Sequence, residues 1–235
     1  MNYSQVNVRQ LDILPEEFIK IPILIIGVGG IGSTTCYILS KMGFKNITIA
    51  DPDKVELHNI STQMYSLEDE GKYKVLALKE KIKKELDIDV KFINKKVSGI
   101  KNEFEDYEII IFALDTMDER IKIWKNIKKY NNATFLIDAR MGLEMIRLYN
   151  FNTCDMNGIR EYEKTLYSSK EAINLPCTGR AVAYNTFFIG SLISLQIRKI
   201  LTEGDGDFEL LLDLGKTDIY KYQFPIIKKR EKKGK

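Results

Sequence analysis

The stretch "IPILIIGVGGIGS", residues 21–33, decides the fold, because an apolar run turns abruptly into glycines. The run 21–28 is apolar at nearly every position, as in a strand that is buried on both faces. A helix is predicted directly after it, from about Ile31 to Met42. Glycines add almost nothing to a core, so a turn that uses four of them indicates that the backbone comes close to another group. The four glycines are Gly27, Gly29, Gly30 and Gly32.

Apolar runs and helical periods alternate along the rest of the chain. This alternation predicts an α/β fold with a doubly wound, mostly parallel sheet. The run 145–151 predicts an antiparallel strand, and two short strands complete the sheet at the C-terminal end, near 208–213 and 218–224. The remaining predicted strands are 46–51, 90–94, 108–114 and 134–139, and the remaining helices are 72–86, 118–129 and 180–201.

Three of the glycines fit the pattern G-x-G-x-x-G between a strand and a helix. Gly27 allows the tight turn, Gly29 lets the backbone approach phosphate oxygens, and Gly32 lets helix and strand pack closely. The helix N-terminus then faces an anion. Asp51 ends the next strand, 19 residues after Gly32, where its carboxylate can accept from ribose hydroxyls. The pattern predicts a Rossmann-like nucleotide site, but it does not separate a dinucleotide from ATP.

Composition excludes several classes of protein. The chain has 235 residues, of which 44% are apolar and 29% charged, as expected for an ordinary globular protein. No apolar run is long enough to span a membrane, and the N-terminus has no secretory signal. The formal charge of +3 argues against a nucleic-acid partner. Three cysteines (Cys36, Cys154 and Cys177) indicate no disulfide framework and a reducing, cytoplasmic setting.

The predicted organisation is a single domain with two appendages. Residues 1–20 form an N-terminal arm, and residues 21–225 form the domain. Within it the crossover segment 152–178 shows weak periodicity, so we expect a structureless and functional connection there. Residues 226–235 form a basic tail that we expect to be disordered.

Further motifs come after the glycines in a set order. They are "DPDKVELHN" with Asp51, Asp53 and Asn59, "NISTQ" with Gln63, "DEGKYK" with Lys74 and "ALDTMDER" with Asp115. Together they resemble the family of ThiF, MoeB and the ubiquitin-activating enzymes. The segments "VNVRQLDILP" (6–15) and "CTGRA…FIGSLISLQIRKIL" (177–201) extend the resemblance over nearly the whole chain.

The resemblance implies an ATP-dependent adenylyltransferase. Its substrate would be the C-terminal carboxylate of a small ubiquitin-like or sulfur-carrier protein that ends in Gly-Gly, and it would act as a homodimer with ATP and Mg²⁺. Such a carboxylate is already anionic and needs no general base. The difficulty is repulsion between the carboxylate and the triphosphate, so cations and oriented N–H groups must neutralise charge.

The resemblance also assigns roles to single residues. Asp115 would hold Mg²⁺, and Lys74 would reach phosphate oxygens. Arg9 would supply charge to the site of a partner subunit. Asp53 and Asn59 would help to fix the ribose and the loop on the metal side, and Asp51 and Gln63 complete the expected nucleotide-binding residues.

Two further questions concern the residue that accepts the acyl group and an arginine that the family usually has. Cys177, at the start of the last long helix, would receive the acyl group, although a half-buried structural cysteine is the alternative. Cys36 lies inside the first helix and is expected to pack there. Thr62 stands where the family usually has arginine, and Arg140, just past the fifth strand, is a candidate replacement.

Two other functions compete with this interpretation. An NAD(P)-dependent oxidoreductase would explain the glycines and Asp51, but not Lys74 or Asp115. A non-catalytic ATP-binding partner subunit is compatible with the change at Thr62. The chain lacks the Cys-x-x-Cys pairs with which many small relatives bind zinc, so no structural zinc is expected.

Overall fold

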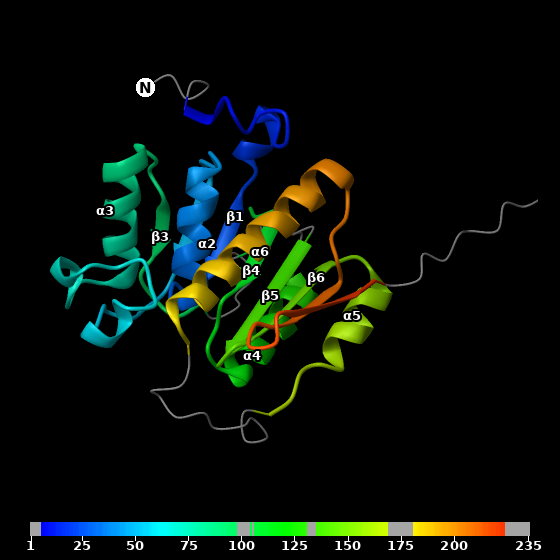
Figure 1. The fold of residues 1–235 in the computed structure, drawn as a ribbon. Coiled ribbons are helices and arrows are strands. Elements are labelled where there is room, and N and C mark those ends of the chain that lie inside the picture. Colours follow the sequence, from blue (N-terminus) through cyan, green and yellow to red (C-terminus); the bar gives the residue numbers. More distant parts are fainter. Residues whose placement is uncertain (1–5, 98–103, 105, 131–134, 169–180, 224–235) are drawn as a thin grey trace, which may run out of the picture.

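The computed structural model describes residues 6–97, 104, 106–130, 135–168 and 181–223. These residues form one sheet with the strand order β3-β2-β1-β4-β5-β6-β7-β8 (Figure 1). The strands are β1 (Ile23–Ile26), β2 (Ile47–Ala50), β3 (Lys91–Ile93), β4 (Ile109–Phe112), β5 (Phe135–Gly142), β6 (Met145–Asn152), β7 (Glu209–Asp213) and β8 (Asp218–Tyr222).

The sheet is parallel from β3 through β5 and antiparallel from β5 to β8. The predicted fold class, a doubly wound and mostly parallel sheet with antiparallel C-terminal strands, is therefore confirmed. Each predicted strand is present, usually shorter than expected by a residue or more at its ends. β1 is buried at every position, as its apolar run predicted.

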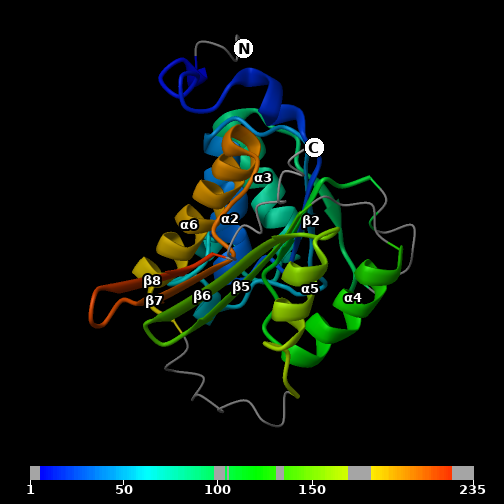
Figure 2. The ribbon, with the colours of Figure 1, turned by 90° about the vertical axis from the view of Figure 1, so that its right-hand side faces the viewer.

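Helices cover both faces of the sheet (Figure 2). One face carries α2 (Gly30–Lys41), α3 (Lys74–Leu86) and α6 (Ala183–Glu203), and the other carries α4 (Met117–Tyr130) and α5 (Met156–Glu163). Side chains alternate between the two cores: Ile23 and Ile25 of β1 face α2, whereas Leu24 and Ile26 face α4. Short 3₁₀ turns complete the described secondary structure: η1 (Glu16–Lys20), η2 (Leu57–Asn59) and η3 (Leu67–Asp69).

The expectation of a structureless segment at 152–178 is wrong in its first half, where α5 forms. The Asp155 carboxylate caps this helix by accepting from the N–H groups of Asn157 and Gly158, at 3.0 and 3.1 Å. Ile159 and Tyr162 bury one side of it against the sheet. Residues 169–180, with Cys177, and the predicted tail 226–235 lie outside the described residues.

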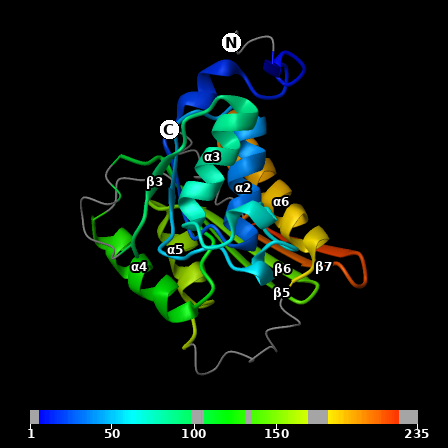
Figure 3. The same cartoon turned by 90° about the vertical axis from the view of Figure 1, so that its left-hand side faces the viewer.

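The order of the strands creates a switch point next to β1. The chain leaves β1 towards β2 and β3 on one side, and β4 and β5 lie on the other. In open parallel sheets, ligands bind outside the carboxyl ends of the strands at such a point. The loops that come after β1, β2 and β4 meet there, and these loops carry the glycines, Asp51 with Asp53, and Asp115. The described part of the N-terminal arm, residues 6–20, lies at the end of α2 away from the glycine turn (Figure 3).

Candidate active site

Two of the glycines are required by the packing of the chain itself. Gly27 has φ of 90°, and a Cβ there would lie 2.4 Å from the carbonyl oxygen of Ala113 in the loop after β4. A Cβ at Gly32 would lie 1.9 Å from the carbonyl oxygen of Gly27. Neither backbone oxygen can move far without breaking the sheet or the turn. These two positions therefore bring α2 and the β4 loop against the end of β1.

Gly29 differs, because the packing of the described residues does not require a glycine there. Its φ of −73° lies outside the left-handed region and its ψ is −147°, and a Cβ built on it would meet no atom of the described residues within 4 Å. Gly29 is the N-cap of α2, and no side chain of the described residues caps the helix. A ligand can therefore reach the first N–H groups of α2, because Gly29 has no side chain in front of them. At the neighbouring Gly30, a Cβ would lie 2.9 Å from the methyl group of Thr186 and 3.5 Å from the carbonyl oxygen of Thr62.

Asp51 braces the glycine turn. One carboxylate oxygen accepts from the N–H of Val28 and the other from the N–H of Asp53, each at 2.8 Å. Burial raises the pKa of Asp51, while these two amides and the charge of Lys74 oppose that rise. The carboxylate that was predicted to meet a ribose therefore also joins the end of β1 to the loop after β2.

Lys74 and Asp53 are brought together at the start of α3. Lys74 Nζ donates to Asp53 Oδ2 at 3.1 Å, and the Lys74 N–H donates to the Asp53 carbonyl oxygen at 2.9 Å. The lysine side chain is 10% exposed, whereas the aspartate side chain is 64% exposed. The nearly buried ammonium group of Lys74 thus contacts a carboxylate that faces solvent, and this ion pair orients both groups.

Asp115 is exposed in the loop after β4, and a lysine that the sequence interpretation missed lies near it. Lys96, three residues past β3, donates to Glu119 Oε1 at 2.7 Å. Glu119 raises the pKa of Lys96, and the charges of Asp115 and Asp53 add to this effect. The lysine therefore lies in the field of both carboxylates. Its position after a parallel strand was the available signal, since the carboxyl ends of parallel strands share one edge.

Asn59 and Gln63 lie on the loop that runs along the glycine turn. Asn59 is buried, and its Oδ1 accepts from the Glu56 N–H at 2.9 Å, so it shapes the η2 turn. The Met64 N–H donates to Ser33 Oγ at 3.2 Å and ties this loop to α2. Gln63 Oε1 is buried without a hydrogen-bond partner in the described part of the chain.

One other predicted residue, Arg9, is not gathered here. Arg9 is exposed on the arm, where Gln10 Nε2 donates to the Lys41 carbonyl oxygen at the far end of α2, so Arg9 does not reach the site of its own chain. Cys177 lies outside the described residues. Cys36 is fully buried, and burial raises its pKa to about 12, as expected of a packing residue. Cys154 is exposed.

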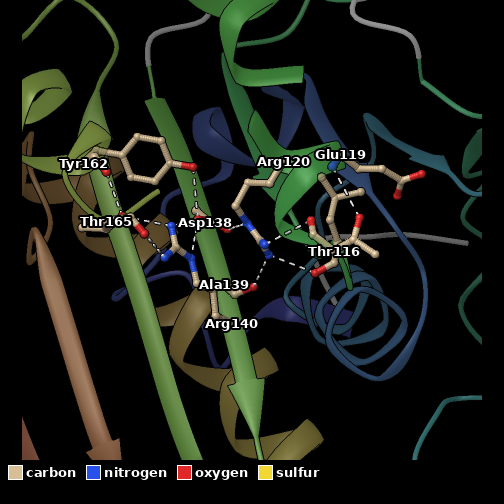
Figure 4. A network of polar contacts seen from close by, with 9 residues as sticks. Thr116, Glu119, Arg120, Asp138, Ala139, Arg140, Tyr162 and Thr165 are labelled. Atoms are coloured by element: carbon tan, nitrogen blue, oxygen red, sulfur yellow. Dashed lines mark hydrogen bonds and ion pairs between the residues drawn. The ribbon is translucent and has the colours of Figure 1, made fainter. Parts of the chain in front are cut away.

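The hypothesis that Arg140 replaces a phosphate-facing arginine is wrong. Arg140 points into the face covered by α5, where it pairs with Asp138 at 2.7 Å and donates to the Thr165 carbonyl oxygen at 2.9 Å (Figure 4). Its guanidinium also lies 4.8 Å from the ring centre of Tyr149. Arg140 was expected just past the fifth strand, but β5 continues to Gly142, so Arg140 lies inside the strand and its side chain takes the face that α5 covers.

Neither a metal cluster nor a membrane span is found in the described part of the chain. Among those residues, no group of three or more His, Cys, Asp or Glu side chains is arranged to hold a metal ion. No helix among them has the length and apolar character needed to cross a bilayer.

Comparison with known proteins identifies the family. The model of the ThiF family matches residues 16–235. The chain belongs to the ThiF family. The match confirms the resemblance that the order of motifs indicated.

Relatives of this ThiF-family chain differ widely. It is 31% identical over 101 residues to a NEDD8-activating enzyme E1 catalytic subunit from Arabidopsis thaliana, a match over 42% of this chain and 22% of that protein. The matched region is therefore only a small part of a much longer relative.

Two solved structures share the fold of this ThiF-family chain. E. coli MccB with AMPCPP and MccA has a TM-score of 0.69 at 17% identity, covering 90% of this chain and 66% of that one. The E. coli tRNA N6-threonylcarbamoyladenosine dehydratase TcdA, in complex with AMP, has a TM-score of 0.66 at 17% identity, covering 86% and 96%. At these identities the likeness concerns the fold alone.

Proposed function

We propose that this chain is an ATP-dependent adenylyltransferase that activates the C-terminal carboxylate of a small ubiquitin-like or sulfur-carrier protein. The observation that carries the proposal is Gly29. It opens the N-terminus of α2 at the switch point of the sheet, and packing among the described residues does not require a glycine there. The first N–H groups of a helix have no partner within the helix, so a position beside them that is kept free of a side chain fits a phosphate group.

The neighbouring residues fit the rest of ATP. Lys74, held in place by Asp53, supplies a positive charge beside the phosphates. The exposed Asp53 and the braced Asp51 offer acceptors to ribose hydroxyls. Asp115 would hold Mg²⁺, which commonly takes one or two protein carboxylates together with phosphate oxygens. When bound, the ion would neutralise charge on the triphosphate and on the departing pyrophosphate.

In this reaction the residues of the chain position the substrates and neutralise charge, and they transfer no proton. A carboxylate oxygen of the partner forms a bond to the α-phosphorus, the bond from the α-phosphorus to the bridging oxygen breaks, and pyrophosphate leaves. The acyl-adenylate that forms contains no new proton, so no general base is needed. The amides of α2 and Lys74 lower the barrier by stabilising charge in a geometry that exists before the substrate arrives.

The partner and the assembly are part of the proposal. The relatives include an enzyme named for activating NEDD8, a structure with a peptide and a dehydratase of a tRNA base, so a protein carboxylate is one of several substrate classes. We favour a Gly-Gly carboxylate, a homodimer in which Arg9 serves the partner's site, and Cys177 as the acyl acceptor, in a cytoplasmic setting. No structural zinc is included.

Isotope exchange between pyrophosphate and ATP tests the function. Exchange that depends on an added Gly-Gly-terminated protein and disappears in Asp115→Asn supports adenylation. Hydride transfer would give no exchange and would require NAD(P). The homodimer predicts complementation: Arg9→Ala and Asp115→Asn, each inactive alone, regain part of the activity when mixed, because one site of the mixed dimer is intact. Absence of complementation would contradict a role of Arg9 in trans.

A second candidate is a non-catalytic ATP-binding subunit. The observation that favours it is the lack of a guanidinium at Thr62, together with the engagement of Arg140 by Asp138 and Thr165. Tight binding of ATP without any pyrophosphate exchange, for every acceptor protein supplied, would select this candidate.

A further inference from the structure

A buried guanidinium holds the loop that carries Asp115. Arg120 lies one turn into α4, its side chain is 4% exposed, and its Nε donates to Asp138 Oδ1 of β5 at 2.6 Å. Arg140 binds the other oxygen of the same carboxylate, and the Tyr162 hydroxyl donates to it at 3.1 Å (Figure 4). Asp138 is thus fully engaged, and it anchors both guanidinium groups to β5.

The outer nitrogens of Arg120 reach the backbone on both sides of Asp115. One donates to the Leu114 carbonyl oxygen at 2.9 Å, and the other makes a longer contact with the Thr116 carbonyl oxygen at 3.4 Å. The residue before Leu114 is held from the opposite side, because the Ala113 N–H donates to the Ile26 carbonyl oxygen at 2.9 Å. The backbone around Asp115 is therefore clamped between β1 and β5, while its carboxylate stays exposed.

We infer that Arg120 is a positioning residue that fixes the Asp115 carboxylate for the metal of Mg-ATP. The inference rests on the proposed function. A planar fork with several donors is needed for this task, because one side chain must hold a carboxylate and two carbonyl groups at once. Residues that orient a metal-binding carboxylate act on metal affinity without touching the metal.

Arg140 provides a matched control. It is buried against the same carboxylate, but its other hydrogen bonds go to Thr165 and not to the Asp115 loop. Arg120→Gln and Arg140→Gln each remove one guanidinium from Asp138, so both lose stability for the same reason. Only Arg120→Gln also releases the loop. A difference between the two variants therefore reports on the loop.

The experiment measures ATP affinity calorimetrically, once with Mg²⁺ and once with EDTA. In the wild-type chain, Mg²⁺ should raise the affinity for ATP. We expect Arg120→Gln to make this gain in affinity smaller by about tenfold or more, and to leave the affinity for ATP in EDTA unchanged. Arg140→Gln should keep the gain. In an Asp115→Asn background, Arg120→Gln should have no further effect on the gain, because the group that it positions is already lost.

Arg120→Lys is the second variant, in case Arg120→Gln does not fold. It keeps a charge for Asp138, but its single terminal nitrogen cannot also hold the loop, so it too should lose the gain from Mg²⁺. Equal losses in the Arg120 and Arg140 variants, a loss in EDTA as large as that in Mg²⁺, or a failure of both Arg120 variants to fold would overturn the inference. If the wild-type chain binds no Mg-ATP, the proposed function fails first and the inference falls with it.

Discussion

Replacing Gly29 and Gly32 separately by alanine distinguishes a glycine kept for a ligand from a glycine kept for packing. At Gly32 the new methyl carbon would lie 1.9 Å from the Gly27 carbonyl oxygen, whereas non-bonded heavy atoms sit roughly 3.5 Å apart. At Gly29 the methyl group would meet no atom of the described residues within 4 Å, at a φ of −73°. The two substitutions are chemically identical and three residues apart, so each serves as the control of the other.

The magnitudes depend on these distances. Overpacking costs about 1–3 kcal/mol, and Gly32→Ala belongs at the upper end because the obstacle is backbone. For a domain of this size about 3 kcal/mol lowers Tm by roughly 6–12 °C. Gly29→Ala places alanine at an N-cap, where glycine is preferred, so it should cost no more than about 1 kcal/mol. Its methyl group would instead meet the phosphate, so ATP affinity should fall on the order of 10–100-fold, by the same overpacking cost.

Thermal melts monitored by circular dichroism give the first quantity, and calorimetric titration with Mg-ATP gives the second. The expected pattern is a melt no more than about 2–4 °C below the parent's with weak binding for Gly29→Ala, and a clearly earlier melt for Gly32→Ala. If Gly29→Ala melts as early as Gly32→Ala, the open space beside it is filled by the chain. If it binds ATP as tightly as the parent, the glycine turn is not the phosphate site.

Three further outcomes are expected. Asp138→Ala leaves two buried guanidinium groups without their carboxylate and should cost about 3–5 kcal/mol in urea unfolding; a loss below about 1 kcal/mol would show that water replaces it. At about pH 8, close to the ordinary pKa of a thiol, a thiol reagent should modify Cys154 rapidly and Cys36 only on unfolding, because burial raises the pKa of Cys36 to about 12; peptide mass spectrometry distinguishes the sites. Burial alone would raise the pKa of Asp207, but donors from Lys199 and Gln196 hold it below its usual range. Its stabilisation is therefore present above about pH 4 and is lost as pH falls through the lowered value. Asp207→Asn should cost about 1–3 kcal/mol at neutral pH and much less at about pH 2, and equal losses at both pH values would contradict this.

Local patterns predicted the fold because they repeat at each step of the chain. The apolar run before Gly27 and the alternation after it gave the order of strands and helices, and parallel strands placed Asp51, Asp53 and Asp115 at one edge. The helix α5 was not predicted, because it is short and only Ile159 and Tyr162 mark its buried side strongly.

The sequence did not predict those residues of the site whose role depends on the face of a helix or strand from which the side chain projects. Arg120 occupies a place in the apolar stripe of its helix, alongside Met117, Trp124 and Ile127, and Asp138 stands inside an apolar strand. Opposite charges at two core positions indicate a buried ion pair, so a signal for this pair is present in the sequence. The pairing of Lys96 with Glu119 joins two segments that are distant in sequence, and no local pattern carries it.

The brace formed by Asp51 has a consequence for engineering and for evolutionary drift. Its two oxygens accept from amides of different loops, so the position requires a short side chain with two acceptors. Asparagine would place its amide nitrogen against one of these N–H donors, and glutamate is longer by a methylene. Changing this residue in order to alter nucleotide preference would therefore also loosen the turn that presents the nucleotide, so that any such redesign must rebuild both loops together.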